Sequence, residues 1–478
     1  MASCSFTSTG RKFTLNVTEV SYSIENNTST IYWDINISGG GTQWYDSYCK
    51  ATVNGLTVYN ETKSWSSGVF PAKDGSASGY IYNVTHDSKG KASVSFDIEG
   101  YSEIYSTQSS SGTLILTTIP RASDIAVSNT ELGQNVPIVI GKKVSSFTST
   151  LSYTIGSLTG TIVDKTSLSN YPWVMESTLI NQIKNAYPNS GSYAKGGIEA
   201  KVICKTYNRA TLIGTKEASF KLYIVDKPTI SGATRAELNT NILAQTTNVL
   251  RHASQNKFTI TATAPTGASI VSYRVRNGTQ DSGTSTSNIV NLNDIQEYYE
   301  ENNALKTKFI VTCIDSRGNE SDEYSVVCDF INYIPVSINK TDVTLKRSTG
   351  TSTDCKLYAI GNFYNGKFGS TNNVIIFKYR HKLKTSSTWG NWTTIPVTYT
   401  DNTFKINNQA ISGTFDYAEN YDFELMATDK IGDTDDYALV FATSVAIAKY
   451  HKNGADFSGL SVNGYIVPYF TVEEDWQE

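Results

Sequence analysis

The chain has 478 residues, with 40 Lys and Arg against 44 Asp and Glu, and a formal net charge of −4. This length is too great for one hydrophobic core and indicates several domains in series. The slightly acidic balance offers no overall basic field for a polyanion, which argues against nucleic acid as a partner. No apolar run approaches the roughly 18 residues of a membrane helix, which argues against membrane insertion.

The composition favours strands over helices. The chain holds 30 Tyr and 18 Phe but only 10 Pro and 3 Met, and aromatic and β-branched residues suit a pleated sheet. The segment at the N-terminus carries neither a charged nor an apolar run, so no secretory signal is predicted. We therefore expect an all-β protein that is made in a cytoplasm.

Residues 1–120 have the period of half-buried strands. Two runs alternate apolar with polar residues, and Asn54-Gly55 marks a two-residue hairpin turn between two further strands. The apolar members of the two runs are Phe13, Leu15 and Val17, and then Ile31, Trp33, Ile35 and Ile37. The pattern predicts a jelly-roll or Ig-like β-sandwich with loops at both ends.

Three short segments at the end of this region form a distinctive series. A turn, His86-Asp87-Ser88-Lys89-Gly90, precedes an alternating strand, and the segments Ser111–Leu116 and Thr117–Ser123 follow. Together they resemble a family of minor tail structural proteins of siphophages that infect Gram-positive bacteria. The resemblance implies a tail-tip or baseplate protein of the virion, made in the host cytoplasm, with other phage tail proteins as partners and no catalytic role.

The remaining chain is repetitive. Asp315-Ser316-Arg317-Gly318 and Asp429-Lys430-Ile431-Gly432 both follow an alternating strand, 114 positions apart (429 − 315). A period near 110 residues suits Ig-like or fibronectin type III-like sandwiches. The predicted domains are 1–120 (N-terminal sandwich, lectin-like or docking), 121–228, 229–335 and 336–448 (three tandem Ig-like sandwiches), and 449–478 (C-terminal hairpin tail).

Two segments have helical spacing. In residues 174–186 the apolar residues Met175, Leu179 and Ile183 lie four apart, which predicts about three turns of helix. A second short helix is expected over residues 294–305. In the tail, Asn453-Gly454 and Asn463-Gly464 predict one or two hairpins.

The cysteines and histidines do not indicate a metal or cofactor. The six Cys form no CxxC pair, and the four His do not cluster with them. Single reduced thiols are therefore expected, without metal, cofactor or disulfide scaffold. A bond between Cys313 and Cys328, which flank one hairpin, is the alternative.

No catalytic motif is present, and no catalytic residue is assigned. His86 is interpreted as hydrogen-bonded to its own turn, although a base would need a Ser or Cys partner from elsewhere in the chain. A glycosidase would need two carboxyl groups across a cleft; the acidic runs Glu297-Glu300-Glu301 and Asp433-Asp435-Asp436 are interpreted as polar turns or helix faces, with an enzymatic role as the alternative. Asp433-Thr434-Asp435-Asp436 is either a solvated turn or, as the alternative, a calcium site.

The aromatic loops are the candidate binding sites. Sugars lay their C–H faces on Trp or Tyr rings while polar side chains bind the hydroxyls. The predicted carbohydrate site comprises Trp44, Tyr45, Asp46, Tyr48 and Trp65, and the secondary candidates are Trp389 and Trp392. In both places the alternative is that the rings pack over a sandwich core.

The sequence therefore favours a non-enzymatic structural and adhesive protein of a phage tail that binds a host cell-surface glycan. A homo-oligomer is expected, because weak glycan sites gain strength through multivalency. One alternative is a tail-associated enzyme that degrades cell wall or polysaccharide. Another is a bacterial Ig-like surface adhesin, against which the missing secretory signal counts.

Overall fold

The computed structural model describes residues 1–39, 46–102 and 106–443, and the backbone of four short strands between 448 and 466. The chain forms two compact units. The first comprises Met1–Asp226, Pro265–Ser269 and Ser316–Asn319, and the second Lys227–Ala264, Ile270–Asp315 and Glu320–Glu478. The finer division into five segments stays a prediction.

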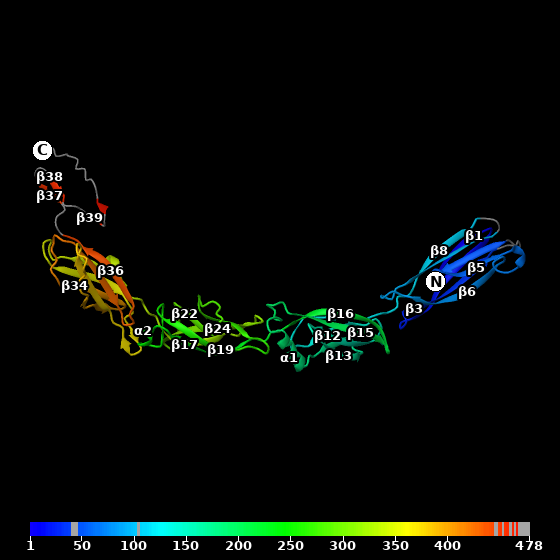
Figure 1. The fold of residues 1–478 in the computed structure, drawn as a ribbon, viewed down its shortest axis with the longest axis horizontal. Helices are drawn as coiled ribbons and strands as arrows, with labels where there is room; N and C mark the ends of the chain where they lie inside the picture. Colours follow the sequence, from blue (N-terminus) through cyan, green and yellow to red (C-terminus); the bar gives the residue numbers. More distant parts are fainter. Residues whose placement is uncertain are drawn as a thin grey trace. The chain divides into compact units, whose positions relative to one another are not determined.

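The first eight strands form a β-sandwich in the first unit (Figure 1). One four-stranded sheet has the order β1-β2-β3-β6 and the other β5-β4-β7-β8. The strands are β1 (Ala2–Ser8), β2 (Arg11–Ser23), β3 (Thr28–Ser38), β4 (Ser47–Val53), β5 (Leu56–Lys63), β6 (Gly75–Thr85), β7 (Ser93–Ser102) and β8 (Gln108–Ile115).

Alternation along these strands fills the core as predicted. On β3, Ile31, Ile35 and Ile37 are buried, and Trp33 is 8% exposed. The turn at Asn54-Gly55 connects β4 to β5 with positive φ at both residues, as a type I′ hairpin requires.

The turn after β6 supports the end of the sandwich. The Gly90 amide donates to the Asp87 carbonyl, and the Gly90 carbonyl accepts from the amide of Ile119. Gly90 has φ +76°, and a Cβ there would lie 1.9 Å from the Ile119 carbonyl oxygen. Only glycine therefore fits this contact without displacing backbone.

A second pair of sheets completes the first unit. The orders are β10-β16-β15-β12-β13 and β14-β11-β9. The helix α1 (Ser177–Ala186) buries Leu179 and Ile183 as predicted, although it begins at Ser177. The strands are β9 (Asp124–Val127), β10 (Thr130–Glu131), β11 (Val136–Gly141), β12 (Thr148–Ile155), β13 (Leu158–Thr166), β14 (Asn170–Trp173), β15 (Ile198–Asn208) and β16 (Thr211–Tyr223).

Arg317 lies in one of the two short loops that belong to this unit, and its side chain is fully buried. Its guanidinium donates to the carbonyls of Lys184 and Thr266 at 2.7 Å and of Tyr187 at 3.0 Å. A buried charge is tolerated because carbonyl dipoles replace its lost water.

The second unit contains the next two sets of sheets. The first set has the orders β17-β19-β22 and β18-β25-β24-β20-β21, with β23 paired to β24. Its elements are β17 (Thr229–Glu237), α2 (Thr240–Leu243), β18 (Val249–Leu250), β19 (Gln255–Thr263), β20 (Ile270–Asn277), β21 (Gln280–Asp281), β22 (Ile289–Asn293), β23 (Tyr299–Glu301), β24 (Ala304–Asp315) and β25 (Tyr324–Ile331).

The helix expected over residues 294–305 is wrong. Strands β23 and β24 form a hairpin there, and Asn302 and Asn303 make its turn with φ values of 53° and 60°. Asparagine tolerates the left-handed region and so supports a tight hairpin.

The second set is built around sheets β26-β28-β34-β33 and β32-β31-β35-β36, with β27 paired to β28 and a small β29-β30 pair. The strands are β26 (Ser337–Ile338), β27 (Thr344–Lys346), β28 (Cys355–Asn362), β29 (Lys367–Phe368), β30 (Thr371–Asn372), β31 (Ile376–Leu383), β32 (Thr393–Ile395), β33 (Thr398–Thr400), β34 (Thr403–Ile411), β35 (Tyr421–Thr428) and β36 (Thr434–Phe441).

The backbone of the tail pairs β37 (Ala448–His451) with β38 (Gly454–Phe457), and β39 (Ser461–Val462) with β40 (Tyr465–Ile466). The expected all-β fold of serial sandwiches ending in hairpins is therefore confirmed. All six cysteines are free, and Cys313 pairs across strands with Tyr273 rather than with Cys328.

Candidate functional site

The predicted aromatic site of the first sandwich is only partly described. Trp44 and Tyr45 lie outside the described residues. Asp46 and Trp65 are brought together, because the Trp65 backbone amide donates to Asp46 Oδ1 at 2.7 Å. Trp65 opens the short 3₁₀ helix Trp65–Ser67 and its side chain is 59% exposed. The ring is thus held at its backbone and open to solvent.

Tyr48 belongs to a cluster across strands β4 and β7. Its hydroxyl donates to Glu99 Oε1 at 3.0 Å, and the Lys50 ammonium binds the same oxygen at 3.2 Å. Its ring centroid lies 5.7 Å from that of Tyr101. Desolvation and the Glu99 hydrogen bond raise the pKa of Tyr48, whereas Lys50 lowers the pKa of Glu99. These contacts position Tyr48 on the sheet.

Trp389 and Trp392, the secondary candidates for a carbohydrate site, both contact the guanidinium of Arg380. The Arg380 guanidinium lies 4.9 Å from the Trp389 ring centroid and 4.8 Å from that of Trp392. Arg380 also binds Glu424, and the Lys382 ammonium lies 5.1 Å from the Trp389 ring. A cation–π contact of this kind covers one face of a ring, and a sugar would have to use the other.

The sequence reasoning missed a group of tyrosines on the outer surface of β3 and β6, which we call the tyrosine face: Tyr80 and Tyr82 are exposed, and Tyr32 is half-buried. The Tyr80 centroid lies 5.2 Å from that of Tyr32 and 5.8 Å from that of Tyr82. Tyr80 is 54% exposed and Tyr82 66% exposed. The alternation Tyr80-Ile81-Tyr82 was the available signal, because a buried Ile81 directs both neighbours outward.

Short polar side chains surround the tyrosine face. Thr18 is the cross-strand partner of Tyr32, which in turn pairs with Tyr80. One step along the sheet, Asn16 donates to Asp34 Oδ2 at 2.9 Å. This surface combines flat rings with hydroxyl, amide and carboxylate groups, the chemistry that recognises polyols.

His86 is hydrogen-bonded to its turn, as interpreted from the sequence. Its Nδ1 donates to the Gly90 carbonyl at 2.9 Å, and its Nε2 lies 2.7 Å from Ser29 Oγ. Ser29 Oγ also lies 2.6 Å from Glu19 Oε1. Ser29 is 1% exposed and His86 8% exposed, so this Ser–His pair is enclosed within the sandwich end.

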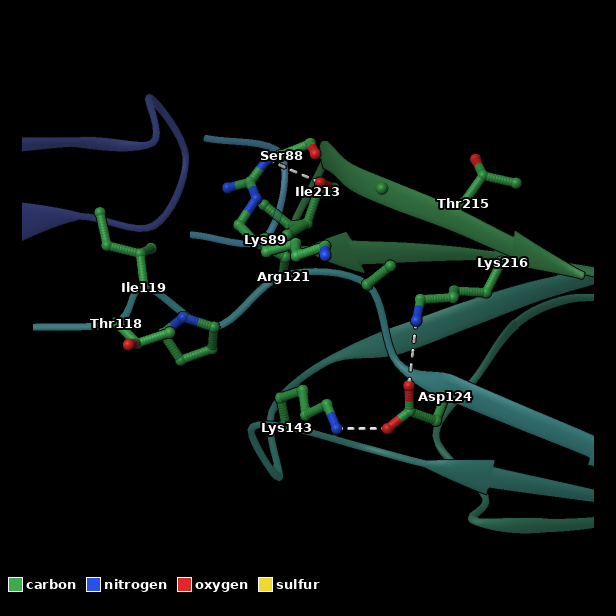
Figure 2. A pocket seen from close by; sticks show the side chains of 13 residues that line it. Ser88, Lys89, Thr118, Ile119, Arg121, Asp124, Lys143, Ile213, Thr215 and Lys216 are labelled. Atoms are coloured by element: carbon green, nitrogen blue, oxygen red, sulfur yellow. Dashed lines mark hydrogen bonds and ion pairs between the residues drawn. The ribbon is translucent and has the colours of Figure 1, made fainter. Parts of the chain in front are cut away.

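A hollow of about 840 Å³ lies in the first unit and is lined by residues between Ser88 and Lys216 (Figure 2). Figure 2 shows Asp124 between Lys143 and Lys216, and both ammonium groups bind its carboxylate, Lys216 at 3.2 Å. The hydrogen bonds from these two cations lower the pKa of Asp124, and the one from Lys143 has the larger effect. Arg121 and the exposed Lys89 complete the charged lining.

The acidic run suggested as a calcium alternative has other partners. The Asp433 carboxylate accepts from the Val336 amide at 2.7 Å and from the Tyr333 hydroxyl at 2.8 Å. Asp435 accepts from the Ile338 amide at 2.7 Å. Among the described residues, no group of three or more His, Cys, Asp or Glu is placed to hold a metal ion. Within the same residues, no helix is long and apolar enough to cross a membrane.

Several solved structures are similar to the chain at low identity. A tetra-tandem repeat from the extending region of a large adhesion protein is 14% identical, with a TM-score of 0.25, covering 90% of this chain and 98% of that one. Sidekick-1 immunoglobulin domains 1–5 are 9% identical, with a TM-score of 0.27, covering 89% and 76%. Three N-terminal domains of the bacteriophage RB49 Highly Immunogenic Outer Capsid protein are 10% identical, with a TM-score of 0.23, covering 67% and 96%.

No curated protein matches the chain. One family model, described as "Siphovirus protein of unknown function (DUF859)", matches residues 3–466. That match spans nearly the whole sequence, and the chain therefore belongs to this siphovirus protein family.

Proposed function

We propose that the chain is a non-enzymatic structural and adhesive component of the siphophage tail tip or baseplate, and that it binds a host cell-surface glycan through its N-terminal sandwich. Membership of a siphovirus family supports a role in a phage. The tyrosine face carries the adhesive part of the proposal. Neighbouring exposed rings with a polar rim are typical of an interaction site.

A row of rings along one sheet suits an extended polysaccharide chain, although the Tyr32 and Tyr80 rings are tilted by 56° to each other. Rings spaced 5.2 and 5.8 Å apart along one sheet offer successive stacking positions to successive sugar units, while Thr18, Asn16 and Asp34 offer hydrogen bonds. The exposed Trp65, whose backbone amide binds Asp46, is proposed as a second point of attachment. Assembly with other tail proteins as a homo-oligomer would multiply such weak contacts.

Binding of the full chain to isolated host cell walls tests the proposal. The variant Tyr80→Ala/Tyr82→Ala should weaken binding by about tenfold, because each lost ring removes a stacking contact of roughly 0.5–1.5 kcal/mol. Tyr417→Ala, which removes a tyrosine that is 40% exposed in the second unit, is the matched control. Equal binding by the double variant and the wild type would contradict the assigned surface.

The runner-up is a wall-degrading enzyme, and the same samples test it. Release of soluble sugar from the walls by the wild-type chain would contradict the non-enzymatic proposal. The enclosed Ser29–His86 pair argues against that outcome, because a catalytic serine must reach its substrate.

A further inference from the structure

The hollow drawn in Figure 2 concentrates positive charge in an acidic chain. Its lining holds Lys89, Arg121, Lys143 and Lys216 against one carboxylate, Asp124. The local balance is thus 4 − 1 = +3, whereas the chain carries −4. A concave surface lined by one sign of charge focuses its field and attracts the opposite sign.

Asp124 binds two of these cations and leaves each of them with further hydrogen-bond donors. Its two oxygens bind one ammonium each, from Lys143 and Lys216. An ammonium has three N–H donors, so each retains donors for a further acceptor. The carboxylate therefore brings two ammonium groups together at the edge of the hollow.

Arg121 adds a charge whose hydrogen bonds go to neutral groups. Its guanidinium donates to the carbonyl oxygens of Ile24 at 2.7 Å and Ile213 at 2.6 Å. Arg121 is half-buried, and this burial lowers the pKa of its guanidinium. A desolvated cation with neutral partners is stabilised by an anion nearby.

Lys89, from the turn after β6, is exposed like Lys143 and Lys216 and lines the same hollow. The nearest acid, Asp87, accepts hydrogen bonds at 2.8 Å from the backbone amides of Lys89 and Lys91. Its carboxylate is therefore committed to its own turn, and it attracts Lys89 through space. Lys89 and the ammonium pair at Asp124 therefore line one hollow.

We propose that this hollow binds phosphodiester groups of an acidic surface glycan. Phosphate oxygens accept several charge-assisted hydrogen bonds from converging ammonium and guanidinium groups. A volume of about 840 Å³ admits a segment of polymer rather than a single carboxylate. The proposal rests on the proposed adhesion to a host glycan, and it assigns the charge class of that ligand.

Calorimetric titration of the full chain with inorganic tripolyphosphate tests the site. Lys89→Gln should weaken binding about two- to fivefold, the factor that corresponds to one surface ion pair. Asp124→Asn should strengthen binding, because it removes the one carboxylate and releases two ammonium groups. Lys308→Gln, which removes an exposed lysine of β24 outside the hollow, should change nothing.

Opposite signs for Lys89→Gln and Asp124→Asn, with Lys308→Gln unchanged, support the proposal. Absence of saturable binding, or equal weakening by Lys308→Gln, overturns it. Tighter binding of a short DNA duplex than of a polyol-phosphate glycan also overturns it, because the site would then serve nucleic acid. Tyr80→Ala/Tyr82→Ala should retain tripolyphosphate binding. Loss of cell-wall binding by this variant therefore tests the adhesion proposal alone, and a change in tripolyphosphate binding by Lys89→Gln or Asp124→Asn tests the phosphate site alone.

Discussion

The hydroxyl of Tyr333 lies 2.9 Å from Oδ2 of Asp429, inside a small core of the second unit. Tyr333 is 2% exposed, and its neighbours there include Ile242, Phe368 and Ile431. Burial raises the pKa of both Tyr333 and Asp429. The single proton of this hydroxyl is shared between Asp429 and Asp433, which also accept hydrogen bonds from Asn373 and from the Val336 amide, respectively.

Tyr333→Phe removes that donor while leaving the ring. We expect a loss of about 1–3 kcal/mol in local stability, because the two carboxylates lose the one buried donor that they share. Hydrogen–deuterium exchange at the Val336 amide, which donates to Asp433, should accelerate accordingly. Tyr417→Phe is the control, and equal exchange in both variants would show that the hydroxyl is dispensable.

Substitutions at two glycines with the same φ angle distinguish the cost of backbone strain from the cost of a steric clash. Gly10 and Gly90 both have φ +76°, but only at Gly90 would a Cβ meet the Ile119 carbonyl oxygen. Gly10→Ala should cost about 1 kcal/mol, and Gly90→Ala clearly more. Urea unfolding of the two variants measures the difference, and equal costs would contradict the described contact.

Ser29→Ala tests the buried network at the end of the first sandwich. The change removes the hydroxyl that joins Glu19 to His86, so both polar groups lose a buried partner, at a cost of about 1–3 kcal/mol. Thermal unfolding should show this loss for Ser29→Ala and none for Ser21→Ala, an exposed serine of β2. An unchanged melting temperature for Ser29→Ala would sink the prediction.

Arg274 and Asp281 form an ion pair that lowers the pKa of Asp281 to about 2, chiefly through the Arg274 hydrogen bond. The folded pKa of Asp281 is below its ordinary value of 3.8. The ion pair therefore contributes its full stability at pH values above 3.8, and this contribution is lost as the pH falls through about 2. In Arg274→Gln, carboxyl NMR titration should show the Asp281 pKa rising toward its ordinary value. A pKa that stays near its wild-type value would contradict the assigned cause.

Burial also makes the thiols unreactive. It raises the pKa of Cys49 and of Cys355 to about 12, and a thiol reacts as its thiolate. Ellman's reagent should label native protein slowly, with Cys328 first because it alone is half-buried. All six should react in guanidinium. Rapid native labelling that persists in Cys328→Ser would contradict the described burial.

Alternation predicted which strand residues are buried, because each side of a strand meets one environment. It could not predict what the loops contact. Arg317 and Ile431 occupy matching positions of a repeat, yet Arg317 binds backbone carbonyls and Ile431 enters an apolar core. The contacts of each loop depend on residues that are distant in sequence, so the local pattern could not predict them.

The candidate site was predictable only in part. Asp46 and Trp65 were grouped from their residue types as parts of a carbohydrate site; the Trp65 amide donates to Asp46, and the site itself stays a prediction. The tyrosine face was not predicted, because Tyr32 and Tyr80 become neighbours only through the pairing of β3 with β6. The expected helix over 294–305 failed because Asn302 and Asn303 adopt a hairpin turn.

Immunogold electron microscopy of purified phage particles, with antibody raised against the full chain, tests the central claim most directly. The proposal of a structural and adhesive tail component predicts gold at the tail tip or baseplate of intact virions. Particles that carry no label, while the protein is abundant in the lysate from which they were purified, would contradict it.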